Sequence, residues 1–197
     1  MKLYHGTNQS SALNICVNGI NLLCSAKYLD FGVGFYTTKD EYKAIKRARK
    51  KTDDFNKRCK TNEVPYVVEL TIDDKKLKNY SIMEFDGHDI EWCKFVLNNR
   101  LKDNFLHKNK FLHHNKDNKY DIVFGEIADG KITDIAYRIR NNELDICDVD
   151  YSQILTDNEE PYGNQVSFHT TKSLSCITSL NCDIIRKSNK MKGGEWL

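Results

Sequence analysis

The chain has 197 residues, of which 40% are hydrophobic and 29% are charged, and its formal net charge is +2. This length favours one domain with a substantial core, and this composition excludes a chain that is disordered throughout. The small net charge excludes a polycation that would bind nucleic acid through its bulk charge alone. Seven cysteines without a CxxC pair and no long apolar run favour reduced thiols, no membrane partner and a cytoplasmic location.

β-Branched runs, amphipathic runs and glycines predict an alternation of strands and helices. The predicted strands cover residues 2–5, 35–37, 64–72, 80–85, 120–125, 165–169 and 182–185. The predicted helices cover residues 11–18, 38–52, 89–101, 130–143 and 171–180. Residues 102–119, rich in Lys, Asn and His, are expected to form a flexible loop. Because the strands lack a regular βαβ rhythm, we expect an α+β fold with antiparallel pairing, in a single domain over residues 1–197.

Local signals mark the ends of several of these helices. Gly19 is expected to end the first helix. Thr38 and Glu41 have the spacing of a capping box, in which a hydroxyl and a carboxylate satisfy orphan amides at the start of a helix. Thr170 or Thr171 is expected to cap the last helix.

The run LYHGT places a histidine at the end of the first predicted strand. Gly6, directly after His5, would let the backbone approach a ligand closely, and Thr7 adds a hydroxyl. A structural or solvated histidine is the alternative for this short motif. The run therefore suggests a binding site without specifying its ligand.

The run DFGVGFYTT combines two glycines with two aromatic residues. Gly32 and Gly34 make a flexible loop before Phe35 and Tyr36, and aromatic rings stack well on flat ligands. The alternative is a tight turn in front of a core strand. The DFG triplet does not indicate a protein kinase, because the glycine-rich loop, strand lysine and HRD-type loop of kinases are absent.

Two further features have both a functional and a structural interpretation. Gln165 begins the strand in NQVSFH and either faces a ligand or faces solvent. The helix over residues 38–52 has a basic face that Arg58 and Lys60 extend. That face is either solvated or a docking site for a phosphate-bearing substrate.

Five motifs in a fixed order resemble the ADP-ribosyltransferase superfamily: LYHGT, DFGVGFYTT, IEWCKFVLNNR, YDIVFGEIADGKI and NQVSFHTTKSL. They resemble its diphtheria-toxin-like and poly(ADP-ribose) polymerase branch, and more closely an uncharacterised bacterial branch. The resemblance implies a split β-sandwich of two small antiparallel sheets with flanking helices, and NAD in the cleft between them. It also implies transfer of ADP-ribose to a protein or nucleic-acid acceptor by a bacterial toxin or effector, sometimes paired with a small antitoxin.

The resemblance further implies a catalytic set of His5, Tyr36 and Gln165. The NAD-binding residues that it implies are His5, Gly6, Thr7, Phe31, Gly32, Gly34, Phe35 and Tyr36. His5 would bind a ribose hydroxyl, and Tyr36 would stack on the nicotinamide ring. The transition state is oxocarbenium-like, so a carboxylate beside the ribose would stabilise its positive charge.

The superfamily carries that carboxylate where this chain has Gln165, which is neutral. Three interpretations follow. This branch works with glutamine, which we favour; or Asp30, Glu126 or Glu160 supplies the charge; or the protein is an inactive NAD-binding or protein-interaction module.

Two other classes of site receive less support. RNA 2′-phosphotransferases share the implied fold and an HGT-like start, but they need arginines around the histidine, and residues 1–46 contain none. A metal site made of His107, His113, His114 and Asp117 would match no common zinc spacing, so no metal is expected.

Overall fold

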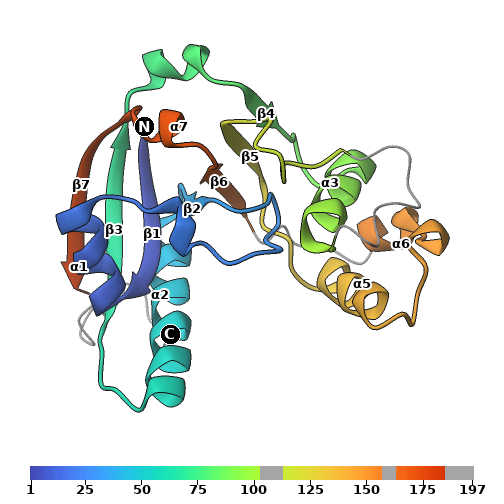
Figure 1. Ribbon diagram of the computed structural model, residues 1–197, viewed down its shortest axis with the longest axis horizontal. Coiled ribbons are helices and arrows are strands. Elements are labelled where there is room, and N and C mark those ends of the chain that lie inside the picture. Colours follow the sequence, from blue (N-terminus) through green and yellow to red (C-terminus); the bar gives the residue numbers. More distant parts are fainter. Residues whose placement is uncertain (103–112, 157–162, 185–197) are drawn as a thin grey trace, which may run out of the picture.

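The computed structural model describes residues 1–102, 113–156 and 163–184. Seven strands form one mixed sheet in the order β4-β5-β6-β2-β1-β3-β7, with helices packed around it (Figure 1). The predicted α+β class is confirmed. The strands form one continuous hydrogen-bonded sheet, where two separate antiparallel sheets were expected, and the β4–β5 pair is parallel.

The strands are β1 (Lys2–Asn8), β2 (Phe35–Thr38), β3 (Pro65–Ile72), β4 (Ile82–Glu84), β5 (Ile122–Glu126), β6 (Asn164–Phe168) and β7 (Ile177–Ile184). The α-helices are α1 (Gln9–Asn18), α2 (Glu41–Cys59), α3 (Ile90–Arg100), α5 (Lys131–Arg140), α6 (Tyr151–Thr156) and α7 (Thr171–Leu174). Three short 3-10 turns are η1 (Leu22–Cys24), η2 (Asp74–Asn79) and η3 (Ile146–Asp148). Of these elements, α6 and the three 3-10 turns were not predicted.

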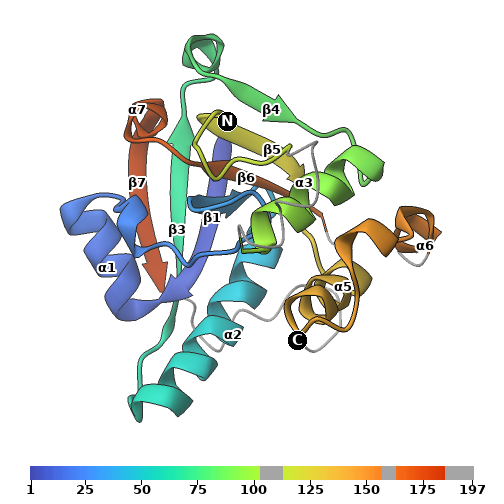
Figure 2. The same cartoon turned by 45° about the vertical axis from the view of Figure 1, so that its right-hand side comes forward.

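The sheet is narrowest between β1 and β2. β1 pairs with β3 at seven positions, whereas one pair, Tyr4 with Thr38, joins β1 to β2. On its other edge β2 pairs with β6 at four positions. The sheet therefore has two halves, β7-β3-β1 and β2-β6-β5-β4, which meet at this pair and run in different directions (Figures 1 and 2).

Helix α2 packs closely against β1 because position 6 is a glycine. Ala44 and Ala48 form the buried side of the helix at this contact. A Cβ atom on Gly6 would overlap the carbonyl oxygen of Ala44 and lie 2.7 Å from the amide nitrogen of Ala48. Both obstacles are backbone atoms, so no side chain can move aside. The packing of α2 is therefore sufficient to explain this glycine.

Two large hydrophobic clusters pack against the sheet, and the second of them spans both halves. The larger cluster surrounds Phe31 and is built mainly by α3, α5 and α6. Helix α5 contributes four buried residues with helical periodicity: Ile132, Ile135, Ala136 and Ile139. The second cluster contains Leu3, Phe35 and Leu70, with Ile15 of α1 packed against it. Because Phe35 lies on β2 and Leu3 and Leu70 lie on β1 and β3, the second cluster joins the two halves of the sheet.

The end of the chain differs most from the predicted elements. The helix expected over residues 171–180 stops at Leu174, and the strand β7 begins at Ile177. β7 pairs with β3 along its length, so the open edge of β3 decides the conformation of a segment whose local pattern was ambiguous. Thr170 caps α7 as predicted, by accepting a hydrogen bond from the amide of Ser173.

The cap of α2 also differs. Asp40 caps the helix by accepting hydrogen bonds from the amides of Tyr42 and Lys43. The capping box of Thr38 and Glu41 is therefore wrong, because Thr38 belongs to β2 and its hydroxyl donates to the carbonyl of Asn164. Gly19 ends α1 as predicted, with a positive φ of 82°. Residues 103–112 of the loop predicted over 102–119 lie outside the described residues.

Cys16 of α1 and Cys182 of β7 form a disulfide, so the prediction that all thiols are reduced is wrong. The two residues are 166 positions apart, a spacing that carries no local signal. The other five cysteines are not in a disulfide: Cys24, Cys59, Cys93, Cys147 and Cys176. Among the described residues, no helix combines the length and apolar character needed to cross a membrane.

Candidate functional site

The three residues of the predicted catalytic set come from three consecutive strands of the sheet. His5 lies on β1, Tyr36 on β2 and Gln165 on β6. The His5 Nδ1 atom is 2.6 Å from the carbonyl oxygen of Tyr36. Thr38, two positions after Tyr36, pairs with Gln165. The set is therefore gathered at the junction between the two halves of the sheet.

His5 is held as a neutral imidazole with a defined tautomer. A carbonyl oxygen can only accept, so Nδ1 carries the proton and donates it to Tyr36. Burial, with help from the nearby Lys51 and Arg47 charges, lowers the pKa of His5 to about 4. The ring also stacks on Phe35 at 4.5 Å. No group in the described residues hydrogen-bonds Nε2, which is left as an acceptor for a hydroxyl.

The hydroxyl of Tyr36 is committed to the loop that precedes β2. It donates to the carbonyl of Gly32 at 2.6 Å and accepts from the amide of Phe31 at 2.9 Å. Burial and the nearby Asp30 charge raise the pKa of Tyr36 well above its usual value. Gly32 has a φ of +93°, a backbone conformation that favours glycine. Tyr36 can therefore offer its ring to a ligand, but not its hydroxyl.

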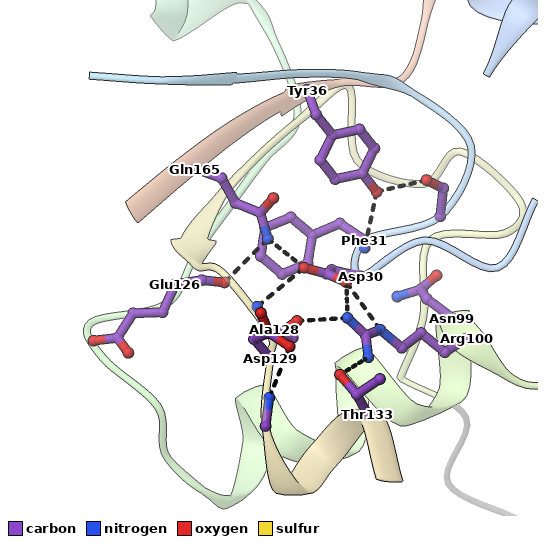
Figure 3. A network of polar contacts seen from close by, with 12 residues as sticks. Asp30, Phe31, Tyr36, Asn99, Arg100, Glu126, Ala128, Asp129, Thr133 and Gln165 are labelled. Atoms are coloured by element: carbon purple, nitrogen blue, oxygen red, sulfur yellow. Dashed lines mark hydrogen bonds and ion pairs between the residues drawn. The ribbon is translucent and has the colours of Figure 1, made fainter. Parts of the chain in front are cut away.

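Gln165 is 7% exposed, and its amide group is oriented by two acceptors (Figure 3). Its Nε2 atom donates to Asp30 Oδ2 at 2.7 Å and to the carbonyl of Glu126 at 3.1 Å. Both amide protons are used, so the assignment of oxygen and nitrogen follows from the contacts. Oε1 points away from Asp30 toward the side of Tyr36, and no donor within the described residues reaches it.

Asp30, one of the alternative carboxylates, lies beside Gln165 but is already paired. Its Oδ1 atom accepts from Arg100 Nε at 2.9 Å and Nη2 at 2.6 Å, and its Oδ2 atom accepts from the amide of Ala128 at 3.1 Å. Arg100 also donates to Thr133 Oγ1 at 2.7 Å and to the Ala128 carbonyl at 2.6 Å. This buried network ties the loop before β2 to α3, α5 and β6 (Figure 3).

The other alternative carboxylates do not approach Gln165. The Glu126 carboxylate contacts His88 Nδ1 through a hydrogen bond of 2.8 Å and points away from Gln165 (Figure 3). Glu160 lies outside the described residues. Of the two predicted alternatives that the structure describes, Asp30 is therefore the one whose carboxylate contacts Gln165.

Several residues predicted to bind NAD have packing roles in this structure. Phe31 is fully buried in the larger core cluster, so the structure gives it no ligand-facing surface. Phe35 is 8% exposed and belongs to the second cluster, where it supports the ring of His5. Thr7 is fully buried. A Cβ atom on Gly34 would lie 2.7 Å from the ring of His169, so packing also explains this glycine.

Sequence reasoning missed two features of the candidate site. The Asp30–Arg100 ion pair joins residues 70 positions apart, and no local pattern announces it. Arg47 and Lys51 act on His5 from α2, although residues 1–46 contain no arginine. A helical projection would have found this second feature, because Arg47 and Lys51 flank the small residues Ala44 and Ala48 on the helix.

The histidine-rich segment does not assemble a metal site in the part of the chain that is described. His113 packs against the rings of Phe95, at 5.0 Å, and Tyr120, at 6.0 Å. His114 Nδ1 lies 3.9 Å from Asp117 Oδ1. No group of three or more His, Cys, Asp or Glu residues with suitable geometry for a metal occurs among the described residues. His107 lies outside them.

A family model described as "Protein of unknown function (DUF3990)" matches residues 1–179. The chain belongs to this family. Comparison with curated proteins gave no match, and neither did comparison with solved structures. The DUF3990 match includes His5, Tyr36, Gln165 and the Asp30–Arg100 pair, so the whole candidate site lies within the family domain.

Proposed function

We propose that the protein is an NAD-dependent ADP-ribosyltransferase. In this reaction the bond between the nicotinamide nitrogen and ribose C1′ breaks, and nicotinamide leaves with the bonding electrons. A nucleophile of a macromolecular acceptor bonds to C1′ and loses its proton. The observation that carries the proposal is the gathering of His5, Tyr36 and Gln165 from three consecutive strands at the narrow junction of the sheet.

The finer fold proposal follows from the same junction. The halves β7-β3-β1 and β2-β6-β5-β4 would act as the two small sheets of a split β-sandwich. A dinucleotide would lie where the halves meet, since a single residue pair joins them there. His5 and Tyr36 stand on opposite sides of this junction, one on each half.

Each residue of the set has a role that suits its contacts. His5 Nε2 would accept a hydrogen bond from a ribose hydroxyl, since the imidazole is neutral above a pH of about 4. The ring of Tyr36 would stack on nicotinamide, held in place by its hydroxyl contacts with Gly32 and Phe31. Gln165 Oε1 would accept from a second ribose hydroxyl and fix the sugar for displacement at C1′.

In this proposal the positive charge of the oxocarbenium-like transition state is stabilised indirectly. Gln165 is neutral, but its amide donates to the Asp30 carboxylate at 2.7 Å. Such a charge-assisted hydrogen bond polarises the amide and makes its oxygen a stronger acceptor. A missing direct electrostatic partner can cost about 10²–10³ in rate. We therefore expect slow turnover, because the Asp30 carboxylate acts on the ribose only through Gln165.

A second candidate is an inactive NAD-binding or protein-interaction module of the same fold. The observation that favours it is the Arg100 guanidinium, which neutralises Asp30 through two hydrogen bonds. The two candidates share the NAD site and differ in turnover.

Calorimetry with NAD and a pair of tyrosine variants tests the site that both candidates share. Tyr36→Phe keeps the ring and is expected to keep most of the NAD affinity, whereas Tyr36→Ala is expected to lose at least tenfold. Tyr137→Ala, at a tyrosine that is 56% exposed on α5, is the matched control and should bind like wild type. Thermal unfolding of each variant separates loss of fold from loss of affinity. Absence of NAD binding by folded wild-type protein would contradict both candidates.

A further inference from the structure

We propose that the exposed basic face of α2 binds the phosphodiester backbone of a nucleic acid and presents it to the site as the acceptor. We define this basic face by Lys46, Arg47, Lys50 and Lys51. The role of the bound nucleic acid as acceptor rests on the proposed function. The binding itself does not depend on it.

Positive charge is concentrated in this one helix. Helix α2 with its C-cap residue Lys60 carries nine Lys and Arg residues and three Asp and Glu residues, a net charge of +6. The whole chain has a net charge of +2, so the rest of the protein has −4. A segregation of this kind produces a strong local potential that attracts polyanions.

The basic face is turned away from the sheet. Ala44, Ala48 and Thr52 form the buried side of α2. Arg47, Lys50 and Lys51 are exposed, and successive residues on a helix are rotated by about 100°. The cations therefore spread over the flank and the outer side of the helix, where a long ligand could contact several of them together.

No carboxylate among the described residues forms an ion pair with Arg47, Lys50 or Lys51. Elsewhere on the surface lysines do pair, as Lys2 does with Glu69 at 2.8 Å. Unpaired like charges at a spacing of four residues destabilise a helix. Partial desolvation and the neighbouring Arg47 charge lower the pKa of Lys51. The protein thus keeps an unfavourable cluster that a bound anion would stabilise.

The basic face lies next to the candidate site. Gly6, the neighbour of His5, packs against the backbone of α2, and both Arg47 and Lys51 act electrostatically on His5. Nearer the start of α2, one turn before the basic face, the side chain of Lys43 lies against Gly163, two positions before Gln165. A polyanion on α2 would therefore pass beside β1 and β6, two of the three strands that carry the site.

The composition of the face favours a nucleic acid over an acidic protein. Protein interfaces rely on aromatic or apolar anchors at their centre. The large exposed hydrophobic residues of the described chain are Leu13, Val17, Leu23, Tyr28, Val33, Ile90 and Tyr137. None of them belongs to α2. Cations without apolar anchors suit contacts to phosphates, which need charge and no sequence-specific pocket.

Fluorescence anisotropy with labelled DNA and RNA oligonucleotides, measured without NAD, tests the binding. Arg47→Glu/Lys51→Glu is compared with Lys75→Glu/Lys78→Glu, which makes the same charge change on η2, on the other side of the molecule from α2 (Figures 1 and 2). The α2 variant is expected to lose at least tenfold in affinity. The slope of log K against log salt concentration for the α2 variant is expected to be smaller in magnitude than the wild-type slope by about two. The η2 variant should bind nearly as wild type does.

Two nucleic-acid results would overturn the proposal: no binding by wild-type protein, or equal losses of affinity in both variants. The proposal would also be overturned if an acidic polypeptide bound as tightly as the oligonucleotides and the α2 variant lost that binding too. Nicotinamide release from NAD, measured in parallel without nucleic acid, reports on the proposed function alone. Transfer of labelled ADP-ribose from NAD to the oligonucleotide that is lost in the α2 variant and kept in the η2 variant supports the acceptor role. Nucleic-acid binding by a protein that releases no nicotinamide supports the surface and contradicts the proposed chemistry.

Discussion

Gln165 and Asp30 are 135 positions apart in sequence, yet the amide of Gln165 donates to the carboxylate of Asp30 at 2.7 Å (Figure 3). The second amide proton goes to the carbonyl of Glu126. Both neighbours of this nitrogen are acceptors, so the position needs a side chain with two protons to donate. A glutamine meets this requirement, and an ionised glutamate does not.

We predict that Gln165→Glu destabilises the protein and does not raise NAD cleavage. An ionised glutamate would place a second carboxylate next to Asp30 and remove the Gln165 hydrogen bond to the Glu126 carbonyl, which would keep only the longer contact from the Trp92 indole at 3.3 Å. The free energy of unfolding at pH 7 should fall by about 3–5 kcal/mol, the range for an uncompensated buried charge. Urea unfolding measures this. Wild-type stability with faster cleavage would show that the Asp30 contact does not decide the residue at position 165.

A double-mutant cycle isolates this contact. In Asp30→Asn/Gln165→Glu the carboxylate and the amide exchange places, so a hydrogen bond between the two positions can form again. The double variant should be more stable than the sum of the single losses predicts, by about 1 kcal/mol or more. Strict additivity would mean that the two residues are not coupled. Arg100→Lys serves as a comparison, because it alters the network without touching Gln165.

Gly6→Ala is predicted to destabilise the fold through packing. The new methyl group would overlap backbone atoms of Ala44 and Ala48, so α2 would have to move away from β1. A loss of about 3 kcal/mol is expected, the upper end of the usual range for overpacking. Gly19→Ala is the comparison: its site has no atom within 4 Å, so its cost of about 1–3 kcal/mol comes from the backbone conformation alone, with φ 82° and ψ 179°. A stable Gly6→Ala protein with weaker NAD binding would instead support a ligand-contacting role for this glycine.

Stability is predicted to fall as the pH is lowered from about 6.5 toward 4. His169 is 3% exposed, and its ring nitrogens contact the Val33 carbonyl at 2.7 Å and the Ser167 hydroxyl at 2.8 Å. Burial, partly opposed by the Val33 contact, lowers the pKa of His169 from 6.5 to about 4. In that interval His169 of the unfolded chain binds a proton that His169 of the folded protein does not. The contribution of the neutral His169 to stability is therefore fully present above pH 6.5 and is lost as the pH falls to 4.

Unfolding free energies measured across this interval test the histidine account. The loss that His169 causes is about 3 kcal/mol, from 1.36 kcal/mol per unit of pKa. His5, whose pKa is also lowered to about 4, adds to it in the same direction. His169→Gln should make the pH dependence shallower. The pKa of Asp121 is lowered from its usual value of 3.8, so this carboxyl group changes the stability only below that pH, outside this window. An unchanged slope in His169→Gln would rule out His169 as the source.

Reduction of the Cys16–Cys182 disulfide should destabilise the protein by about 2–4 kcal/mol, because it closes a loop of 166 residues. The thermal midpoint of wild-type protein should therefore fall on addition of a reductant. Cys182→Ser should show the lower midpoint without reductant and no further response to it. Equal midpoints with and without reductant in wild type would show that the bond is absent or has no effect on stability.

Sequence patterns predicted most of the sheet because its strands carry their own signals. The β-branched run of β3 is an example. They failed at β7, where pairing with β3 decides between helix and strand. For the site, the motifs predicted His5, Tyr36 and Gln165, which the structure brings to three neighbouring strands, but they could not show that Phe31 would be buried. The contacts that orient Gln165 join residues far apart in the sequence, so no local sequence pattern could predict them.

Incubation of the purified protein with labelled NAD tests the central claim most directly, by following nicotinamide release and transfer of label to a cell lysate. His5→Ala is the paired variant, because it removes the Nε2 acceptor at the junction between the halves of the sheet. The account predicts release and transfer by wild-type protein, and loss of both in a folded His5→Ala protein. Wild-type protein that releases no nicotinamide in the presence of lysate would contradict it, as would a His5→Ala variant that is as active as wild type.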